Sequence, residues 1–466
     1  MTRTTRGRRG DLPAESSERL QRLVTWAAPL AYEALPLRVR RRAALVLVDD
    51  LAAAVAARDE PEVSRLHENL LARPGVPEST VFRGGQARTD RCTAALANGV
   101  AMSWCELDEG YRVTGCHAGL YALPALLAEA EAGSLRTADV LAALVTAYEI
   151  TARLARAFRF ARMTVHPHAA FAAVGATAAV AAARRADGAL MRDALCAAAT
   201  MAAAGPFTAA ASGALVRNVW AGIGGWQGFH CVEWARIGIA GAPDSPYHAF
   251  VGGLGAKCDP GEIDSRLGEV WAIDDGFHKL HGCCGYSHSA VEAILDLLEV
   301  LPGDRRASDA TRIVLYTHWR AREFDNRRPS TTLGARFSLP HIVAATLALG
   351  HAGPEAFAPA ALDDPVLARL RDRVTLEPFE PELPWPNERP SRVVCEFADG
   401  ARFEATCLSA RGGPDRPLEA AEILDKARRI AAPAYPAFAD VAGALVALDR
   451  PTLATPWRAV VDRITT

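Results

Sequence analysis

A long series of alanine-rich segments constrains the fold of this chain more than any other feature. Between Ser17 and about Pro260 these segments carry Gly, Pro or Asp at their boundaries, which is the punctuation that predicts helices. They are Ala43–Ala57, Leu120–Ala132, Thr137–Ala157, Ala169–Ala183 and Met191–Ala204. Small side chains on many faces let helices approach closely, so the sequence predicts a dense helical bundle.

The character of the chain changes after Asp259-Pro260-Gly261. Short runs of β-branched and aromatic residues then predict strands at Ile313–Thr317, Val374–Phe379, Arg392–Phe397 and Arg402–Cys407. The last two runs flank Ala398-Asp-Gly-Ala401, and Asp-Gly in that position is a strong hairpin signal. Alanine-rich helical sequence resumes at Leu418–Ala431.

This order predicts a mainly α protein with two domains. At 466 residues the chain is longer than the roughly 250 to 300 residues that one core usually serves. We expect a large all-helical domain built from both ends of the chain, residues 17–261 and 411–466. A smaller α+β lid domain, residues 262–410, is inserted between them, and the polar, arginine-rich residues 1–16 are predicted to form a disordered arm.

The net charge limits the kinds of partner to be expected, and the cysteines indicate the cellular compartment. A formal net charge of -2 gives no general reason to expect nucleic acid or an anionic membrane, so a small molecule is the better expectation. Ten cysteines without a signal peptide are interpreted as reduced thiols in a cytoplasmic protein. The long uncharged run Ala194–Val216 consists mostly of small residues and contains Pro206, which predicts a buried helix pair and not a membrane span.

Three carboxylates crowd into a short acidic stretch before a histidine. Glu106, Asp108 and Glu109 precede Gly110, which we expect to end a helix, and His117 follows just before an apolar helix. Crowding or burial raises the pKa of a carboxyl group, and histidine titrates nearest to neutrality. The stretch therefore indicates a proton-transfer site, although a charged helix end would produce the same composition.

A second block, His166-Pro-His168, stands at the start of a predicted helix. Backbone N–H groups at a helix start can bind a substrate carboxylate. The alternative is a pair of solvated histidines at a helix cap.

The densest cluster of functional side chains is Lys279-Leu-His-Gly-Cys-Cys-Gly-Tyr-Ser-His288. Its histidines and cysteines could suggest zinc, but adjacent cysteines do not easily point at one tetrahedral ion, and no C-x-x-C pair accompanies them. We therefore expect no metal, and Lys279 and His288 are predicted to face an anionic substrate. A glycine-rich stretch, Gly222–Gly228, lacks the pattern of a phosphate-binding loop and predicts close helix packing instead.

These pieces together resemble the MmgE/PrpD family, which includes 2-methylcitrate dehydratase, cis-aconitate decarboxylase and iminodisuccinate epimerase. The matching pieces occur in the family's order over roughly residues 40–430. They are Ala97-Asn-Gly99, the acidic turn with His117, Tyr148-Glu149 with Arg153, His166, Ala221-Gly222, the Lys279–His288 block, Ala335-Arg-Phe-Ser-Leu-Pro340, and Gly412-Gly-Pro-Asp415 with Pro417 and Lys426.

The resemblance implies a homodimer with a cofactor-independent site between a helical domain and a lid. It implies that Asp108, His117, His166 and Lys279 are catalytic, and that the substrate is a small di- or tricarboxylate. Arg217, His168, His281, His288 and Tyr111 are expected to contact that substrate.

The sequence also departs from the family's pattern at several of these positions. Arg217 stands where a lysine is usual, and it stays protonated, so it cannot act as a base. His281 and His341 stand where tyrosines are expected, and His168 where threonine is common. Glu106 and Glu109 also differ from the usual acidic turn, and we interpret them as local variation or substrate tuning.

The sequence thus predicts a metal-independent lyase that transfers a proton beside a carboxylate. Dehydration is the first expectation by analogy with the family. Epimerisation and decarboxylation remain open, because the same residues could serve all three reactions. A catalytically silent binding or structural relative is the alternative of a different class.

Overall fold

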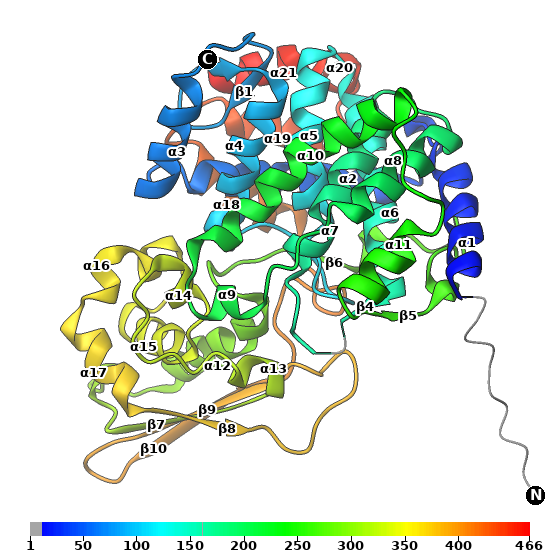
Figure 1. The fold of residues 1–466 in the computed structure, drawn as a ribbon. Coiled ribbons are helices and arrows are strands. Elements are labelled where there is room, and N and C mark those ends of the chain that lie inside the picture. The colour runs from blue at the N-terminus through cyan, green and yellow to red at the C-terminus, as the bar shows by residue number, and fades with distance from the viewer. Residues whose placement is uncertain (1–11, 161) are drawn as a thin grey trace, which may run out of the picture.

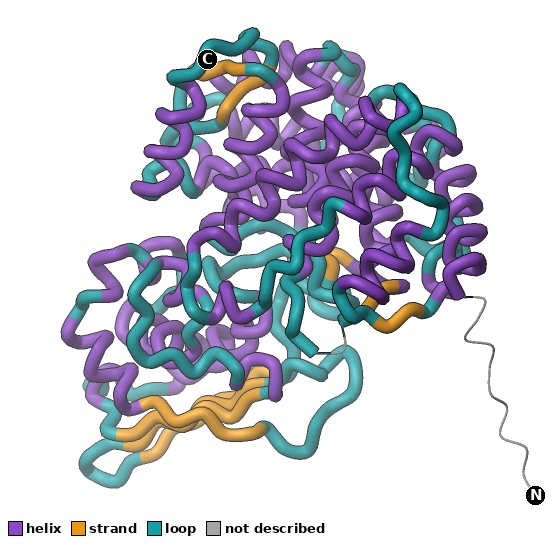
Figure 2. The backbone as a smooth tube through the Cα atoms, in the orientation of Figure 1, coloured by secondary structure: helices purple, strands orange, loops and turns teal. Residues whose placement is uncertain are grey.

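The computed structural model describes residues 12–160 and 162–466, and it is mainly α-helical, as predicted (Figure 1; Figure 2). Residues 1–11 of the predicted arm lie outside the described residues. Leu12 to Ser16, which the arm was predicted to include, instead begin helix α1 (Leu12–Ala27). Leu20, Leu23 and Val24 bury one face of this helix, and that burial holds its polar first turns in place.

The large domain contains helices from both ends of the chain. They are α1, α2 (Leu37–Ala56), α3 (Pro61–Leu71), α4 (Arg91–Trp104), α5 (Ala118–Ala132), α6 (Thr137–Ala157), α7 (Pro167–Ala183), α8 (Gly188–Thr200), α10 (Val219–Arg236), α11 (Ser245–Tyr247), α18 (Ala420–Ala431), α19 (Phe438–Val446), α20 (Arg450–Ala454) and α21 (Trp457–Thr465). The C-terminal α18 packs on α2 and α21 packs on α5, so Leu23 and Trp457 belong to one buried core. Figure 1 shows the red C-terminal helices beside the blue and cyan ones.

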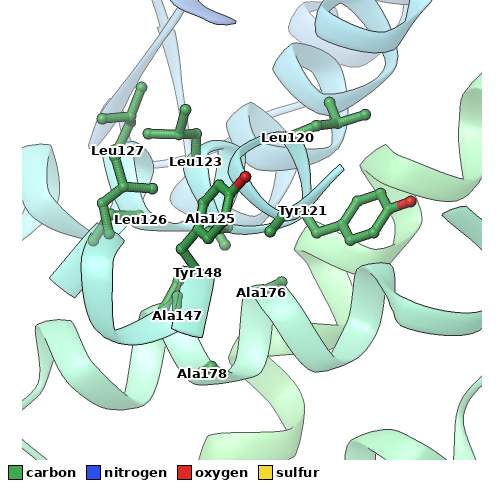
Figure 3. Close-up of a cluster of buried hydrophobic side chains, with 14 of the residues drawn as sticks. Leu120, Tyr121, Leu123, Ala125, Leu126, Leu127, Ala147, Tyr148, Ala176 and Ala178 are labelled. Carbon is green, nitrogen blue, oxygen red and sulfur yellow. The ribbon is translucent and has the colours of Figure 1, made fainter. Parts of the chain in front are cut away.

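Helix α7 lies at the centre of this bundle and packs against α5, α6, α8 and α10. Figure 3 shows side chains of α5 and α6 meeting Ala176 and Ala178 of α7. A Cβ atom added at Gly224 or Gly228 of α10 would lie 2.5 or 2.7 Å from the nearest atom of α7. The glycine-rich stretch is thus a packing surface, as predicted, because only glycine permits this separation.

The lid contains one four-stranded sheet in the order β10-β9-β7-β8. Its strands are β7 (Arg312–Thr317), β8 (Val374–Pro378), β9 (Ser391–Glu396) and β10 (Arg402–Cys407), close to the predicted ranges. β9 is antiparallel to β10 and β7, whereas β7 and β8 are parallel. Gly400 takes the left-handed conformation, φ 84°, in the predicted hairpin turn.

Further helices complete the lid, and some of them pack on this sheet. They are α12 (His288–Val300), α13 (Trp319–Arg322), α14 (Thr332–Arg336), α15 (Leu339–Leu349), α16 (Pro359–Leu362) and α17 (Pro365–Arg373). Helix α12 contacts β9, β10 and α15. The buried side chains of the lid form a hydrophobic core of their own. Phe207, just before the short α9 (Thr208–Ala211), and Ala210 within it pack into this second core although they precede the predicted lid boundary.

The predicted buried helix pair over Ala194–Val216 is wrong. Helix α8 ends at Thr200, an irregular segment follows, and the side chain of Val216 is 57% exposed. Gly205 and Pro206 explain the break, since proline cannot continue a helix and Gly205 lies against the ring of Trp220. None of the helices that the structure describes is long and apolar enough to cross a membrane.

Two-residue strands connect loops at the junction of the domains. β3 (Gly110–Tyr111) pairs with β6 (Gly276–Phe277), and β4 (Phe158–Arg159) pairs with β5 (Lys257–Cys258). β1 (Ser79–Val81) pairs with β2 (Ala87–Thr89) elsewhere in the large domain. The β3–β6 pair brings the acidic stretch beside the segment that carries Lys279.

Candidate active site

The acidic stretch leaves its helix earlier than predicted. Helix α4 ends at Trp104, and Gly110 begins strand β3 instead of ending a helix. Glu106 takes the left-handed conformation, φ 53°, which is uncommon for a residue with a side chain. Strained backbone of this kind clusters at functional sites.

Asp108 and His117 form a close pair at the start of α5. The Nδ1 atom of His117 lies 2.5 Å from Oδ2 of Asp108, and the Asp108 side chain is completely buried. Burial alone would raise the pKa of Asp108, but the charge of Lys279 and the contact with His117 hold that pKa well below its usual range. An ionised Asp108 fixes the proton on Nδ1 of His117 and leaves Nε2 as the ring nitrogen available to a substrate.

Lys279 follows strand β6 and contacts two of the three carboxylates of this stretch. Its Nζ lies 3.1 Å from Oε2 of Glu106 and 3.3 Å from Oδ1 of Asp108. Burial would lower the pKa of Lys279, but Asp108 and Glu106 together raise that pKa above its usual value. Lys279 therefore stays a cation near neutral pH.

Arg217, which precedes α10, is also paired with Glu106. Its Nη1 lies 2.5 Å from Oε1 of Glu106, and its guanidinium stacks 5.3 Å from the ring centroid of Phe337. Burial would raise the pKa of Glu106, but Arg217 and Lys279 lower it to about 2. Glu106 is therefore an ionised bridge between the two cations. The sequence indicates local variation or substrate tuning at this position, whereas the structure gives Glu106 a central position.

His166 caps the N-terminus of α7 and contacts Arg217. The Nε of Arg217 donates to Nε2 of His166 at 3.1 Å, and the backbone N–H of His168 approaches Nδ1 at 3.2 Å. Burial, and then the charge of Arg217, lowers the pKa of His166 well below its usual value. A neutral imidazole has one acceptor nitrogen, so it can accept from only one of these two donors.

His168 lies behind the other two histidines. Its Nδ1 is 2.8 Å from the hydroxyl of Tyr121, and its ring centroid is 4.8 Å from that of His117 and 4.5 Å from that of His166. Burial lowers the pKa of His168 well below its usual value, so the ring stays neutral. His168 therefore packs against the rings of His117 and His166 without lining the cavity itself.

These groups surround a cavity of about 40 Å³ between the two domains. The predicted residues His117, His166, Arg217 and Lys279 line it, and so does Glu106. Much of the remaining wall is aromatic, formed by Phe207, Phe277, Tyr286 and Phe337, and Pro167, Cys284 and Arg389 line it as well. Asp108 reaches the cavity through His117 and Lys279. A cavity of this size holds about three water molecules.

The structure does not bring Tyr111, His281 and His288 to this cavity. Tyr111 packs edge-on against Tyr148, with ring centroids 6.3 Å apart. Nε2 of His288 lies 3.2 Å from the carbonyl oxygen of Cys283, and His281 packs against His288 while lining a separate cavity of about 790 Å³. Their predicted contact with substrate therefore has no geometric support at this site.

His341 is also away from the cavity. Its Nε2 lies 2.8 Å from the carbonyl oxygen of Ala356 and its Nδ1 lies 3.0 Å from Arg371, inside the lid. His341, which stands where the family resemblance predicts a tyrosine, thus does not line the cavity that holds the acid-base groups.

The adjacent cysteines face different surroundings. Cys283 packs with Val291 in one cluster of the lid, whereas Cys284 packs in another and lines the catalytic cavity. Burial raises the pKa of Cys284 to about 12. Among the residues that the structure describes, no group of three or more His, Cys, Asp or Glu side chains could hold a metal ion.

Several residues of the cavity wall were not predicted from the sequence, among them Phe207, Tyr286 and Arg389. Tyr286 lay inside the Lys279–His288 block, so its neighbours were a usable signal. Phe207 and Arg389 sit in loops that carry no motif, and only the fold brings them to the cavity.

Comparison with known proteins identifies the family of this chain. Residues 21–261 match the MmgE/PrpD N-terminal domain and residues 281–446 match the MmgE/PrpD C-terminal domain. The chain is 27% identical over 441 residues to the cis-aconitate decarboxylase-like protein oryM of Aspergillus oryzae, covering 88% of this chain and 89% of that protein. It is 24% identical over 347 residues to cis-aconitate decarboxylase of Aspergillus terreus, covering 69% of this chain and 70% of that protein. The chain therefore belongs to the MmgE/PrpD family.

Proposed function

We propose that this protein is a lyase that decarboxylates a small di- or tricarboxylate, with His117 as the proton donor. Two relatives are named for decarboxylation of cis-aconitate or for likeness to that enzyme, which supports the reaction class by analogy. The observation that carries the proposal is the His117–Asp108 pair at 2.5 Å, beside a cavity lined by Lys279 and Arg217, each of which is paired with Glu106.

His117 is the best candidate for proton transfer among the groups that line the cavity. Lys279 and Arg217 remain protonated, so neither exchanges a proton readily. His166 is kept neutral by burial and by the charge of Arg217, and Arg217 donates to its Nε2. His117 alone combines a fixed ring orientation with a nitrogen free for the substrate.

The chain's own residues can accomplish the reaction as follows. The bond between a carbon and its carboxylate breaks, carbon dioxide leaves, and the electron pair is delocalised toward a second carboxylate. Lys279 and Arg217 stabilise the charge that develops there, and protonated His117 delivers its Nε2 proton to the carbon. Asp108 stabilises the imidazolium before transfer and the correct tautomer after it.

Dehydration, the first expectation from the sequence, requires a base for the carbon-bound proton and an acid for the leaving hydroxyl. The geometry supplies one residue, His117, that is well placed to transfer a proton. Decarboxylation needs a single proton donor, so it fits this geometry better than dehydration does. Epimerisation by two bases meets the same difficulty, because His166 has no free acceptor once Arg217 occupies it.

The reaction class can be tested by incubating the protein with cis-aconitate, citrate and 2-methylcitrate in deuterated water. Release of carbon dioxide with deuterium at the product carbon is the expected outcome. Loss of water alone would establish a dehydratase, and deuterium exchange without loss of either would establish an epimerase. No change in any substrate would favour a silent binding protein.

The role of His117 has its own test. His117→Ala should lower kcat by roughly 10² to 10⁴-fold, the usual contribution of a general acid or base, while circular dichroism shows an intact fold. His288→Ala is the matched control, because it removes a buried histidine outside the cavity. Equal losses in both variants would remove His117 from the mechanism.

A further inference from the structure

A second, larger cavity adjoins the catalytic one. It measures about 240 Å³, and Pro167, Phe207, Tyr286 and Arg389 line both. The inner cavity, with room for about three water molecules, is too small to enclose a whole tricarboxylate. A substrate whose reacting carbon lies beside His117 must therefore extend past Tyr286 into the outer cavity.

The outer cavity is strongly cationic. Its charged lining residues are Arg112, Arg159, Arg162, Arg320, Arg389 and a single carboxylate, Glu388. Arg112 already has hydrogen-bond partners within the protein, because its guanidinium donates to Asp415 and to the carbonyl oxygen of Pro386. Arg159 lies 3.8 Å from Glu262 and Arg389 lies 3.1 Å from Glu388, so the excess of positive charge at the wall comes from Arg162 and Arg320.

The inner cavity is different, because its cations are already neutralised. Glu106 pairs with both Arg217 and Lys279, and Asp108 pairs with Lys279. A polyanionic substrate thus meets balanced charge inside and uncompensated positive charge outside. Its second carboxylate is bound more favourably in the outer cavity.

Arg389 occupies the junction. It is the one described residue that lines the inner cavity, the outer cavity and a third small cavity beside them. Its guanidinium stacks 4.7 Å from the ring centroid of Tyr286, and one nitrogen donates to the carbonyl oxygen of Arg112 at 2.9 Å. The side chain is 13% exposed, and Glu388 lies within 3.1 Å of it. Stacking fixes the planar fork in one orientation, which suits it to bind a carboxylate.

We infer that Arg389 binds a second carboxylate of the substrate at this junction, so that the substrate is a polycarboxylate spanning both cavities. The inference rests on the proposed function and extends it. Tyr286 supplies the stacking platform, and Arg320, 5.9 Å from the same ring, adds charge on the outer side.

The test is the affinity of the full chain for propane-1,2,3-tricarboxylate, an unreactive probe, measured by titration calorimetry. Arg389→Gln should raise the Kd about ten- to hundredfold, the range for losing a hydrogen bond to a charged group. Arg389→Lys, which keeps the charge but loses the fork, should give an intermediate Kd. Arg305→Gln is the matched control, because Arg305 also lies in the lid, stacks on an aromatic ring and pairs with a carboxylate, yet lines neither cavity.

Thermal unfolding of each variant separates binding from folding, and Arg389→Lys carries the test if Arg389→Gln unfolds. Unchanged Kd in the Arg389 variants, or an equal rise in Arg305→Gln, would overturn the inference. If the wild type turns over a polycarboxylate and Arg389→Gln leaves its KM unchanged, the junction site is wrong and the proposed function stands. If the wild type neither binds the probe nor releases carbon dioxide, the proposed function fails and the inference fails with it.

Discussion

Glu106 is the residue that organises the charges of the site. It is fully ionised, buried, and held between Arg217 and Lys279. Without Glu106, the two buried cations would repel each other, and Asp108 would be left as the carboxylate that offsets their charge. A carboxylate that resembled local variation in the sequence is therefore what permits both cations to be buried.

Replacing this carboxylate should be costly. Glu106→Gln is expected to lower the free energy of unfolding by about 3–5 kcal/mol, because it leaves buried charge unpaired. A polycarboxylate should raise the Tm of the variant more than that of the wild type, since the ligand replaces the missing anion. Glu262→Gln, whose partner Arg156 is about one-fifth exposed, is the control and should cost under about 1 kcal/mol. Equal stability of the two variants would contradict the argument.

Glu109 acts on the backbone around His117. It accepts from the N–H of Gly119 at 2.6 Å and from the hydroxyl of Tyr148 at 3.0 Å, and its own N–H donates to Asp50 at 2.6 Å. Burial raises the pKa of Glu109 from 4.5 to about 8 and raises that of Asp50 as well. Glu109 therefore fixes the start of α5 while it carries a proton.

This protonation predicts a pH dependence of stability. The folded protein binds the Glu109 proton more tightly than the unfolded chain does, so its contribution is complete below pH 4.5 and is lost as pH rises toward 8. Glu109→Gln cannot ionise and avoids this loss. The free energy of unfolding of the variant minus that of the wild type should therefore increase by at least about 1 kcal/mol between pH 5 and pH 8, roughly the equivalent of one pKa unit.

Urea unfolding across this pH range measures the difference. A constant gap between variant and wild type would show that Glu109 is ionised in the folded protein.

At the scale of elements, the crossing of α4 and α10 determines where Arg217 lies. A Cβ atom added at Gly99 would stand 2.7 Å from the Cα of Gly222, so the two backbones touch without side chains between them. Arg217 directly precedes α10, and the acidic stretch directly follows α4. The glycine contact therefore sets the distance between Arg217 and Glu106.

Gly99→Ala tests this crossing. It should destabilise the protein by about 1–3 kcal/mol through overpacking and should also lower activity, because the helix ends move apart. Gly443→Ala in α19 is the control: a Cβ there meets nothing within 4 Å, and the change should stabilise by about 0.4–1 kcal/mol. Thermal unfolding and kcat/KM of both variants decide the matter. A neutral Gly99→Ala would show that the helices can separate freely.

At the scale of the whole molecule, the two largest hydrophobic cores meet at the site. The large core draws on both ends of the chain, and the smaller one surrounds the lid sheet. His117, His166 and Arg217 come from the first part, whereas Tyr286, Phe337 and Arg389 come from the second. The cavity exists only when the domains are together.

The homodimer implied by the family resemblance remains a prediction, and the outer face of α10 is the surface we propose for it. Ile223 and Trp226 are each 37% exposed there, and Val216 just before the helix is 57% exposed. A two-fold dimer uses the same patch on both copies, so one apolar face is sufficient. Trp226→Glu should convert a dimer into a monomer in light scattering, whereas Val300→Glu, an exposed apolar residue of the lid, should not. A wild-type monomer would refute the proposal.

Most of the helices and strands, and several residues of the site, could be predicted from the sequence. Alanine-rich periodicity predicted helices, the Asp-Gly turn predicted the lid hairpin, and the motifs pointed to His117, His166 and Lys279, which line the cavity. These signals are local, since a helix, a hairpin or a titratable side chain is written within a few neighbouring residues.

Which charged groups meet depends on the tertiary fold. Glu106 lies far along the chain from Arg217 and Lys279, and Arg389 is in a loop without any motif, so no local pattern could pair them. Likewise, His281 and His288 were predicted to contact the substrate, and folding places them outside the cavity, as it does His341. Burial and charge pairing are properties of the assembled interior, and they determine which of the similar side chains can transfer a proton.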